Sequence, residues 1–209
     1  MRPRALLHAL LRLAFAMLAV VAITYQLARL QGHPGFNPGN FFSFFTIQSN
    51  ILAAAMLAVA ALVRRGERTP LLEAARGAAA FYIAITGVVF AVFLSGLQEQ
   101  LDTHNEFVNS VLHYVIPAVV VADWLLDPPR SRLGSRTALL WLGYPVAWFA
   151  YTLARGSAEH WYPYPFVDVS EHGYAGVAAR GVAFLAAFAA GAVAFAALGE
   201  RLRRRALRC

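Results

Sequence analysis

Residues 41–63 read FFSFFTIQSNILAAAMLAVAALV, an apolar run long enough to cross a lipid bilayer as one helix, yet its first ten positions carry five polar side chains. A hydrocarbon core of roughly 30 Å needs about 20 predominantly apolar residues. Polar groups are costly where they face lipid, so we expect them to face other helices. The five are Ser43, Thr46, Gln48, Ser49 and Asn50.

The whole chain has the composition of a membrane protein. Of its 209 residues, 59% are hydrophobic and 14% are charged, which is far from the balance of a soluble domain. Six apolar runs are long enough to span, and the connections between them are short. We therefore predict an all-α, polytopic membrane protein whose single domain is residues 1–209. The transmembrane helices are expected at about 5–28, 41–63, 77–97, 107–126, 137–154 and 181–199.

The distribution of arginine predicts the orientation of this bundle. All 18 basic residues are arginines, and 15 of them fall on one side of a six-helix topology. The other side keeps Arg29, Arg155 and Arg180 together with six acidic residues: Glu99, Asp102, Glu106, Glu159, Asp168 and Glu171. The positive-inside rule then places both termini in the cytoplasm. The net charge of +7 needs no nucleic acid partner, because the basic C-terminal end is expected to lie on anionic membrane lipids.

The sequence shows no motif for a cofactor or a metal. Its one cysteine, Cys209, excludes an intramolecular disulfide and a multi-cysteine metal site. Glycine-rich phosphate loops, CxxC pairs and HExxH motifs are also missing from the sequence. We expect no metal and no cofactor. The first and last three helices show no internal repeat, which argues against a transporter built from inverted repeats.

Two charged residues of the predicted helices and two of the connecting loops can be explained without a functional site. Arg12 is expected to extend its charge to the membrane interface, and Asp123 to pair with an arginine of the inner loop. That loop, residues 64–77, contains a short amphipathic stretch expected to lie along the interface. The outer loop 156–176 contains WYPYPFVDV at 161–169. This segment fits either an aromatic belt at the headgroups or a lid over the outward mouth of the bundle.

Polar residues on two predicted helices point to one shared site. Thr46, Ser49 and Asn50 are spaced i, i+3, i+4 and share a helix face, as do Asn109 and His113, spaced i, i+4. Each has a structural explanation. A membrane Thr commonly bonds its own preceding carbonyl, Ser and Asn often join helices, and a His near the interface can bond a carbonyl.

The depths of Thr46 and His113 are nevertheless similar. Both predicted helices run inward from the outer surface. Thr46 lies five residues below Phe41, about 7.5 Å, and His113 lies six residues below Phe107, about 9 Å, at the rise of an α-helix. We therefore predict that the two side chains meet in the outer half of the membrane.

Three stretches of the sequence resemble a known family. FFSFFTIQSNIL, LHYVIPAVVVADWLLDPP and WYPYPFVDV resemble signatures of the bacterial six-helix Pr6Pr family, which is distantly similar to the eukaryotic membrane hydrolases of the androgen-induced-gene family. In those hydrolases a membrane Thr is the nucleophile, a membrane His is its partner, and the substrates are fatty acid esters of hydroxy fatty acids. These roles match Thr46 and His113. The resemblance implies a multi-pass protein of the bacterial plasma membrane.

The implied chemistry suits these residue types. A Thr hydroxyl becomes a nucleophile when a base within hydrogen-bonding distance takes its proton, and neutral imidazole is such a base. The substrate would be a lipid ester, with Asn50, Asn109 and Ser49 as candidates for substrate binding or for stabilising the oxyanion. The alternative is a non-catalytic membrane protein, either a small-molecule permease or a scaffold, in which the same polar groups serve only helix packing.

Overall fold

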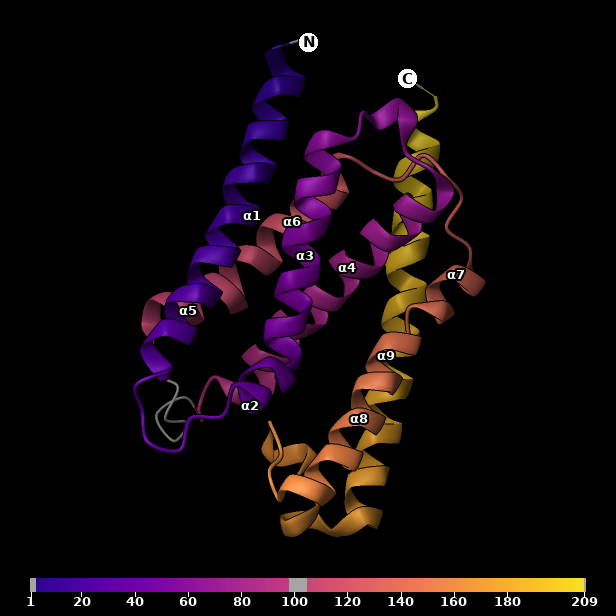
Figure 1. Ribbon diagram of the computed structural model, residues 1–209. Coiled ribbons are helices and arrows are strands. Elements are labelled where there is room, and N and C mark those ends of the chain that lie inside the picture. Colours follow the sequence, from indigo (N-terminus) through magenta and orange to yellow (C-terminus); the bar gives the residue numbers. More distant parts are fainter. Residues whose placement is uncertain (1–2, 98–104, 209) are drawn as a thin grey trace.

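A computed structural model describes residues 3–97 and 105–208, and the secondary structure within them is helical throughout (Figure 1). The α-helices are α1 (Pro3–Leu30), α2 (Pro38–Ser43), α3 (Phe45–Leu62), α4 (Pro70–Val89), α5 (Glu106–Ser110), α6 (Ile116–Leu126), α7 (Ser135–Leu140), α8 (Gly143–Glu159) and α9 (Val169–Ala206). Two π-helices, η2 (Phe90–Leu94) and η4 (Val111–Val115), and two 3₁₀-helices, η1 (Arg65–Glu67) and η5 (Pro165–Val167), connect them. Of the residues considered above, Glu99, Asp102 and Cys209 lie outside the described residues.

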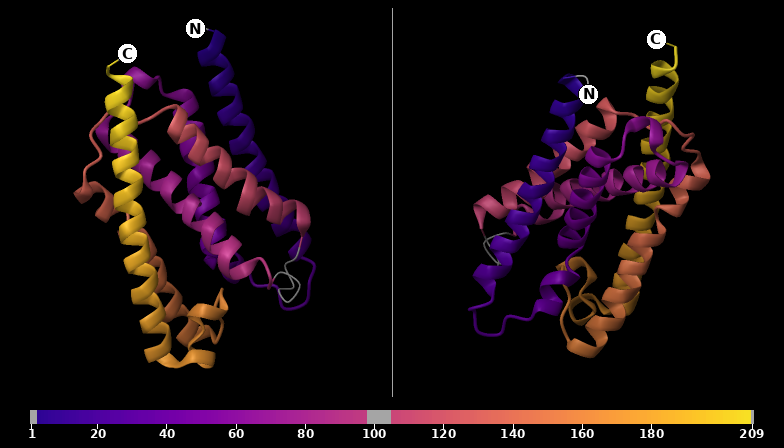
Figure 2. Two further views of the ribbon diagram at one scale, coloured as in Figure 1. Left: turned by 180° about the vertical axis from the view of Figure 1, so that it is seen from behind. Right: turned by 45° about the horizontal axis from the view of Figure 1, so that its top comes forward.

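Six helical spans within the described residues are long and apolar enough to cross a membrane. They are Ala5–Leu30, Phe45–Leu62, Pro70–Leu94, Glu106–Leu126, Ser135–Glu159 and Val169–Ala206. Helix α3 packs against α1 and α4, α4 packs against α6, and α9 packs against α7. The chain begins and ends at the same end of the molecule, while α8 and the first part of α9 form its opposite end (Figures 1 and 2).

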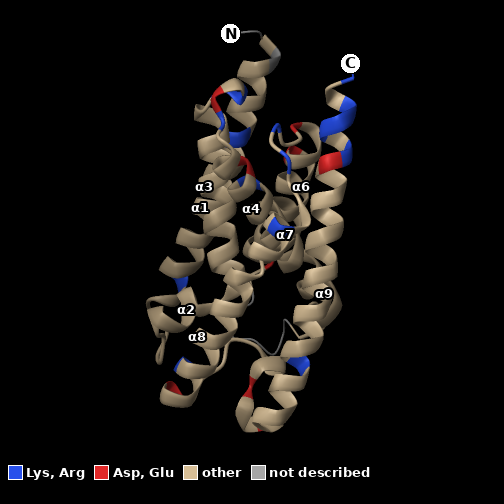
Figure 3. Cartoon of the chain, turned by 90° about the vertical axis from the view of Figure 1, so that its right-hand side faces the viewer, with Lys and Arg blue, Asp and Glu red and all other residues tan. Residues whose placement is uncertain are grey.

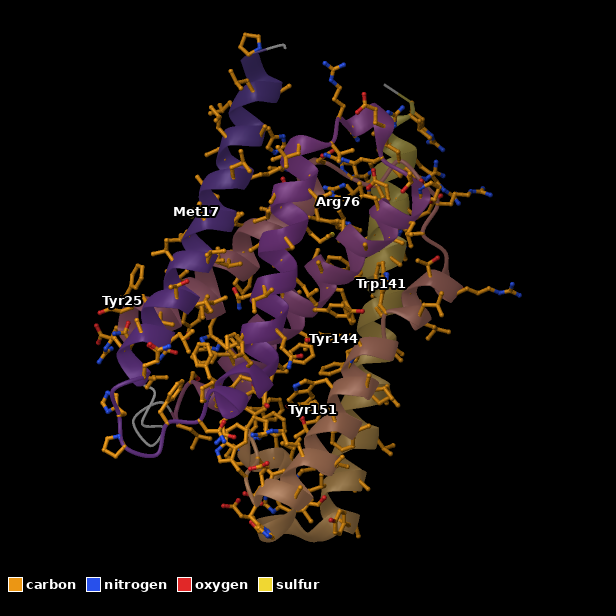
Figure 4. The ribbon with its side chains drawn as sticks, in the orientation of Figure 1. Met17, Tyr25, Arg76, Trp141, Tyr144 and Tyr151 are labelled. Atoms are coloured by element: carbon orange, nitrogen blue, oxygen red, sulfur yellow. The ribbon has the colours of Figure 1, made fainter. Side chains whose placement is uncertain are left out.

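Small residues let α1 and α3 approach closely. Ala19 and Ala22 of α1 and Ala53 of α3 are fully buried. Their faces give van der Waals packing of the kind that joins helices in membranes. The outward face of α1 instead exposes large apolar side chains, among them Met17 (Figure 4) and Tyr25, whose ring is half-exposed and meets Phe107 of α5. Small side chains thus pack between α1 and α3, and large apolar side chains cover the outward face of α1.

The predicted helix at 41–63 is in fact two helices. Asn37 caps α2 by accepting a hydrogen bond from the Gly39 amide, with Pro38 in the first turn, where its missing N–H costs nothing. Phe44 then adopts extended backbone (φ −64°, ψ 128°) and α3 starts at Phe45. The uninterrupted apolar pattern gave no sign of this break, which turns out to shape the site described below.

Three other predicted helices begin or end elsewhere. The helix expected at 77–97 starts at Pro70, capped by Thr69 Oγ1, so the stretch expected along the interface is the start of α4. The helix expected at 137–154 is α7 and α8, which together extend to Glu159. The helix expected at 181–199 is α9, interrupted at Gly173 (φ 63°). By contrast, 5–28 and 107–126 match α1 and the α5–η4–α6 span closely.

The prediction for Arg12 was wrong, because this side chain is buried in an ionic cluster. Its Nε donates to Asp123 Oδ1 at 2.7 Å, and a second nitrogen donates to Asp127 Oδ2. Arg68 Nη1 also donates to Asp127 Oδ2, at 2.7 Å. Asp123 does meet an arginine of the predicted inner loop, since Arg76 Nη2 lies 3.4 Å from it, but Arg12 is its closer partner.

This cluster, which we call the arginine cluster, joins α1, α4, α6 and the segment between α3 and α4. Arg76 also donates to Glu73, which is fully buried. Arg12 and Arg68 both donate to the Ala60 carbonyl near the end of α3. Charged residues gather at the same end of the molecule as the two termini (Figure 3), and Arg76 projects from the upper part of α4 (Figure 4).

Candidate functional site

The break at Phe44 leaves the Thr46 hydroxyl free to bond another helix. In a continuous helix this hydroxyl would bond the carbonyl four residues earlier. Here that carbonyl, from Phe42, accepts from Gln48 Nε2 instead. Among the described residues, the Thr46 hydroxyl hydrogen-bonds His113 and Tyr164, each at 3.3 Å. Because Thr46 is the second residue of α3, it also lies where main-chain amides have no partner within the helix.

His113 is carried by a π-helix, a local widening that frequently marks functional sites. Its ring stacks on Phe90 of the other π-helix, with centroids 3.7 Å apart and planes at 15°. Gly87 allows this close approach of α4, because a Cβ at that position would lie 3.3 Å from the His113 carbonyl oxygen. The imidazole is therefore held by packing in one orientation.

Hydrogen bonding also fixes the tautomer of His113. Its Nδ1 lies 3.3 Å from the Asn109 carbonyl oxygen, which can only accept, so Nδ1 carries the hydrogen. In the neutral ring Nε2 then has a lone pair. Nε2 is the atom 3.3 Å from Thr46 Oγ1, so the Thr46 hydroxyl donates to it. Thr46 and His113 thus meet as their helical depths predicted, in the arrangement of a nucleophile and a base.

Asn50 and Ser49 support the backbone at Thr46. The Asn50 amide donates to the Thr46 carbonyl at 2.9 Å and to the Leu112 carbonyl in the π-helix at 3.1 Å. Ser49 Oγ lies 3.1 Å from the Thr46 carbonyl and 2.7 Å from Thr86 Oγ1 of α4. Both Asn50 amide hydrogens are thus engaged with carbonyls. These two residues hold α3 against its neighbours, and Asn109 supplies the carbonyl that orients His113.

The remaining polar residues of the opening stretch bond α8. Tyr144 donates to Gln48 Oε1 at 2.8 Å, and Trp148 Nε1 donates to the Ser43 carbonyl at 2.9 Å. The Tyr151 hydroxyl lies 2.8 Å from Ser43 Oγ. Tyr144 and Tyr151 point from α8 toward α2 and α3 (Figure 4). All five polar side chains therefore face other parts of the protein.

Residues 160–168 fold back toward α3 and bring Tyr164 into contact with Thr46, a contact that the sequence does not predict. Tyr164 is 7% exposed, and its hydroxyl accepts from the Thr46 amide at 3.3 Å. Burial raises the pKa of Tyr164, outweighing the opposing effect of its hydrogen bonds with Thr46 and Phe45, so the phenol stays protonated at neutral pH. Of the two interpretations of WYPYPFVDV, this contact favours the lid. A tyrosine in an aromatic run gives no sequence signal for such a contact.

An apolar cavity of about 310 Å³ adjoins Thr46. Helices α3, α4, α8 and α9 and the segment around Tyr164 form its walls. Its aromatic lining is Phe45, Trp148, Phe149, Tyr164, Phe166, Phe184 and Phe188. Among the described lining residues, Arg180 carries the one charge, and Thr46 and Thr86 supply aliphatic hydroxyls. The cavity therefore suits an alkyl chain that ends at Thr46.

The fold and the site together define a class of protein. The chain is all-α in its described residues, with six helices long and apolar enough to span a membrane and a Thr–His–Tyr cluster beside an apolar cavity. No family model matches it, and comparisons with curated proteins and with solved structures also find no match.

Proposed function

We propose that this protein is an intramembrane lipid-ester hydrolase in which Thr46 is the nucleophile and His113 is the general base. The observation that carries the proposal is the 3.3 Å contact between Thr46 Oγ1 and His113 Nε2 at the wall of an apolar cavity. Catalytic hydrogen bonds are often long in a site without substrate and shorten in the complex. The resemblance to the Pr6Pr and androgen-induced-gene families supports the same two roles.

The proposed reaction has two stages. His113 Nε2 takes the Thr46 proton as Oγ1 attacks the ester carbonyl, giving a tetrahedral intermediate. When the intermediate collapses, the bond to the alcohol breaks and the His113 proton goes to the departing alcohol oxygen, leaving an acyl-Thr46 ester. Water, deprotonated by the same imidazole, then attacks the acyl carbon; as the bond to Thr46 Oγ1 breaks, the His113 proton returns to Oγ1 and the fatty acid is released. No metal or cofactor enters these steps.

We also propose that the six spans lie in the bacterial plasma membrane with both termini in the cytoplasm. The exposed apolar side chains of α1, such as Met17 and Tyr25, would contact membrane lipids. The basic residues gathered near both termini (Figure 3) fit the positive-inside rule. The Thr46 site would then lie in the outer half of the bilayer.

The orientation can be tested with an impermeant thiol reagent on intact cells. We expect Ser157→Cys, near the end of α8, to react from outside, because α8 ends at the end of the molecule opposite the termini (Figure 1). Ser131→Cys, in the segment between α6 and α7, should react only after the membrane is opened. The natural Cys209 should also stay protected. Labelling of Ser131→Cys but not of Ser157→Cys in intact cells would mean that the orientation is the opposite of the one proposed.

The proposed nucleophile can be tested with a fluorophosphonate probe on the purified protein. We expect covalent labelling, and mass spectrometry of the digested protein should locate the adduct on the peptide that contains Thr46. Prior incubation with a long-chain ester should slow the labelling, because substrate and probe compete for one hydroxyl. An adduct on another residue, or no adduct, would remove Thr46 from this role.

A specific observation favours the non-catalytic alternative. The Asn50 and Ser49 hydrogen bonds to Leu112 and Thr86 are of the kind that join membrane helices. A permease or scaffold would need no more than these. Such a protein would not react with the probe at Thr46, so the same labelling experiment separates the two functions.

A further inference from the structure

We propose that Tyr164 is a third catalytic group, whose hydroxyl donates a hydrogen bond to the oxyanion formed when Thr46 attacks the ester. The inference rests on the proposed function and deepens it, because the sequence assigned no role to this residue. It also gives the segment 160–168 a part in the reaction beyond closing the cavity. The proposal stands on the hydrogen-bond directions at Thr46.

These directions follow from one carbonyl. Asn109 O can only accept, so His113 Nδ1 donates to it and His113 Nε2 accepts from the Thr46 hydroxyl. The Thr46 hydroxyl has one hydrogen, already directed at Nε2. Its 3.3 Å contact with the Tyr164 hydroxyl must therefore be a bond in which Tyr164 donates and Thr46 Oγ1 accepts.

The position of the Tyr164 hydroxyl matches that of an oxyanion donor. In the tetrahedral intermediate the oxyanion and Thr46 Oγ1 are bonded to the same carbon, so a donor aimed at Oγ1 needs only a small shift to reach the new charge. The Thr46 main-chain N–H, which now donates to Tyr164 at 3.3 Å, lies beside it at the start of α3. Together they form a pair of donors, while the Asn50 hydrogens stay with their two carbonyls.

The aromatic ring of Tyr164 is held independently of its hydroxyl. It stacks on Phe166 with centroids 5.2 Å apart, makes an edge contact with Phe44 at 5.5 Å and lies tilted against Trp148 at 5.9 Å. A phenylalanine at this position keeps all three contacts. Substitution by phenylalanine therefore removes the donor and leaves the packing in place.

In the proposed step the phenolic proton is shared and never transferred. The bond between Thr46 Oγ1 and the carbonyl carbon forms, the carbonyl π electrons move to oxygen, and the Thr46 proton goes to His113 Nε2. Tyr164 keeps its proton and strengthens its hydrogen bond as negative charge grows on the carbonyl oxygen. Collapse of the intermediate returns that charge to the carbonyl double bond and releases the alcohol.

The test compares Tyr164→Phe with wild type in the hydrolysis of a long-chain nitrophenyl ester in detergent. We expect kcat to fall by roughly 10²- to 10³-fold, the usual loss when one oxyanion donor is removed, with KM and the thermal unfolding midpoint nearly unchanged. Fluorophosphonate labelling of Thr46 should slow in parallel. Tyr162→Phe is the matched control, because it removes a hydroxyl from the same segment without touching Thr46, and it should retain wild-type kcat.

Each outcome decides the proposal. An unchanged kcat in Tyr164→Phe would make the hydroxyl a packing group, and an increased kcat would show that it blocks the site; either result overturns the proposal while leaving Thr46 and His113 in place. A loss confined to KM would make Tyr164 a substrate-binding residue only, which also overturns it. If wild type neither hydrolyses the ester nor reacts at Thr46, the proposed function fails and the Tyr164 role fails with it.

Discussion

Thr46→Ala and His113→Gln are each expected to lower ester hydrolysis to nearly the same residual rate, and the double variant to lower it no further. Loss of a general base costs roughly 10²- to 10⁴-fold in rate. Glutamine can replace a hydrogen bond to the Asn109 carbonyl or to Thr46, but it cannot accept and return a proton at neutral pH. Alanine removes the attacking oxygen. Groups that act as one proton-transfer unit show such non-additive losses.

The chain offers matched controls for both substitutions. Thr24 lies on α1 and donates to the Val20 carbonyl at 2.7 Å, the ordinary bond of a helical threonine. His172 lies at the start of α9, with Nε2 3.8 Å from Glu171. Thr24→Ala and His172→Gln should therefore retain wild-type turnover, which shows that loss of a helical threonine or of an imidazole is not itself harmful.

The measurement is turnover of a long-chain nitrophenyl ester by purified protein in detergent, with thermal unfolding followed on the same samples. His113→Gln should remain folded, because an amide at this position still finds partners in the bundle worth about 1 kcal/mol. A folded His113→Gln variant with wild-type turnover would end the pairing of Thr46 with His113. Losses that simply multiply in the double variant would mean that the two residues act in separate steps.

Helical rise was sufficient to predict that Thr46 and His113 meet, because both residues lie in the first half of spans that run in the same direction, and depth follows from residue count. It was not sufficient to predict the shape of the backbone around them. The break at Phe44 lies in an aromatic run without glycine or proline, so no local signal marks it. The π-helix at His113 has the same difficulty, since residues 115–122 are apolar on every face and show no period that a wider turn could disturb.

Residues distant in sequence account for the rest of what was missed. Tyr164 reaches Thr46 across 118 positions, and a single sequence carries no trace of that pairing. Arg12 was assigned to the interface because a lone arginine in an apolar helix usually extends its charge there. Its partner Asp123 lies 111 positions away. In both cases composition and periodicity predict the element correctly, while the partner depends on tertiary packing.

Asp127→Ala is the substitution expected to destabilise the protein most, by about 3 to 5 kcal/mol, the usual result of removing one partner from a buried ion pair. Asp127 accepts from Arg12 and Arg68, and Arg65 Nε lies 2.9 Å from its other oxygen. Arg76 Nη2 lies 3.7 Å from Oδ2 as well, so without this carboxylate four guanidinium groups would face one another, three of them buried. Their repulsion would open α1, α4 and α6 at the end where the chain begins and ends.

The same carboxylate predicts a pH dependence. Burial alone would raise the pKa of Asp127, but hydrogen bonds from Arg12 and Arg68 and the charge of Arg76 outweigh it and lower the pKa from 3.8 to about 2. Because the pKa is lower in the folded protein than in the unfolded chain, ionised Asp127 stabilises the fold fully above about pH 4. This stabilisation should be lost as the pH falls from about 4 to 2.

Reversible unfolding in mixed micelles, monitored by circular dichroism at pH 7 and between pH 5 and 2, measures both effects. Glu200→Ala is the matched control: Glu200 accepts from Arg203 at 2.7 Å and from Arg204 at 2.8 Å within α9. An ion pair near the surface contributes at most about 1 kcal/mol, so this variant should unfold close to wild type at pH 7.

Asp127→Asn should lose stability at pH 7 and show a smaller further loss on acidification, because the group that titrates is gone. An Asp127→Ala variant as stable as Glu200→Ala would mean that water or lipid headgroups satisfy the arginines, and that the arginine cluster does not hold the helices together.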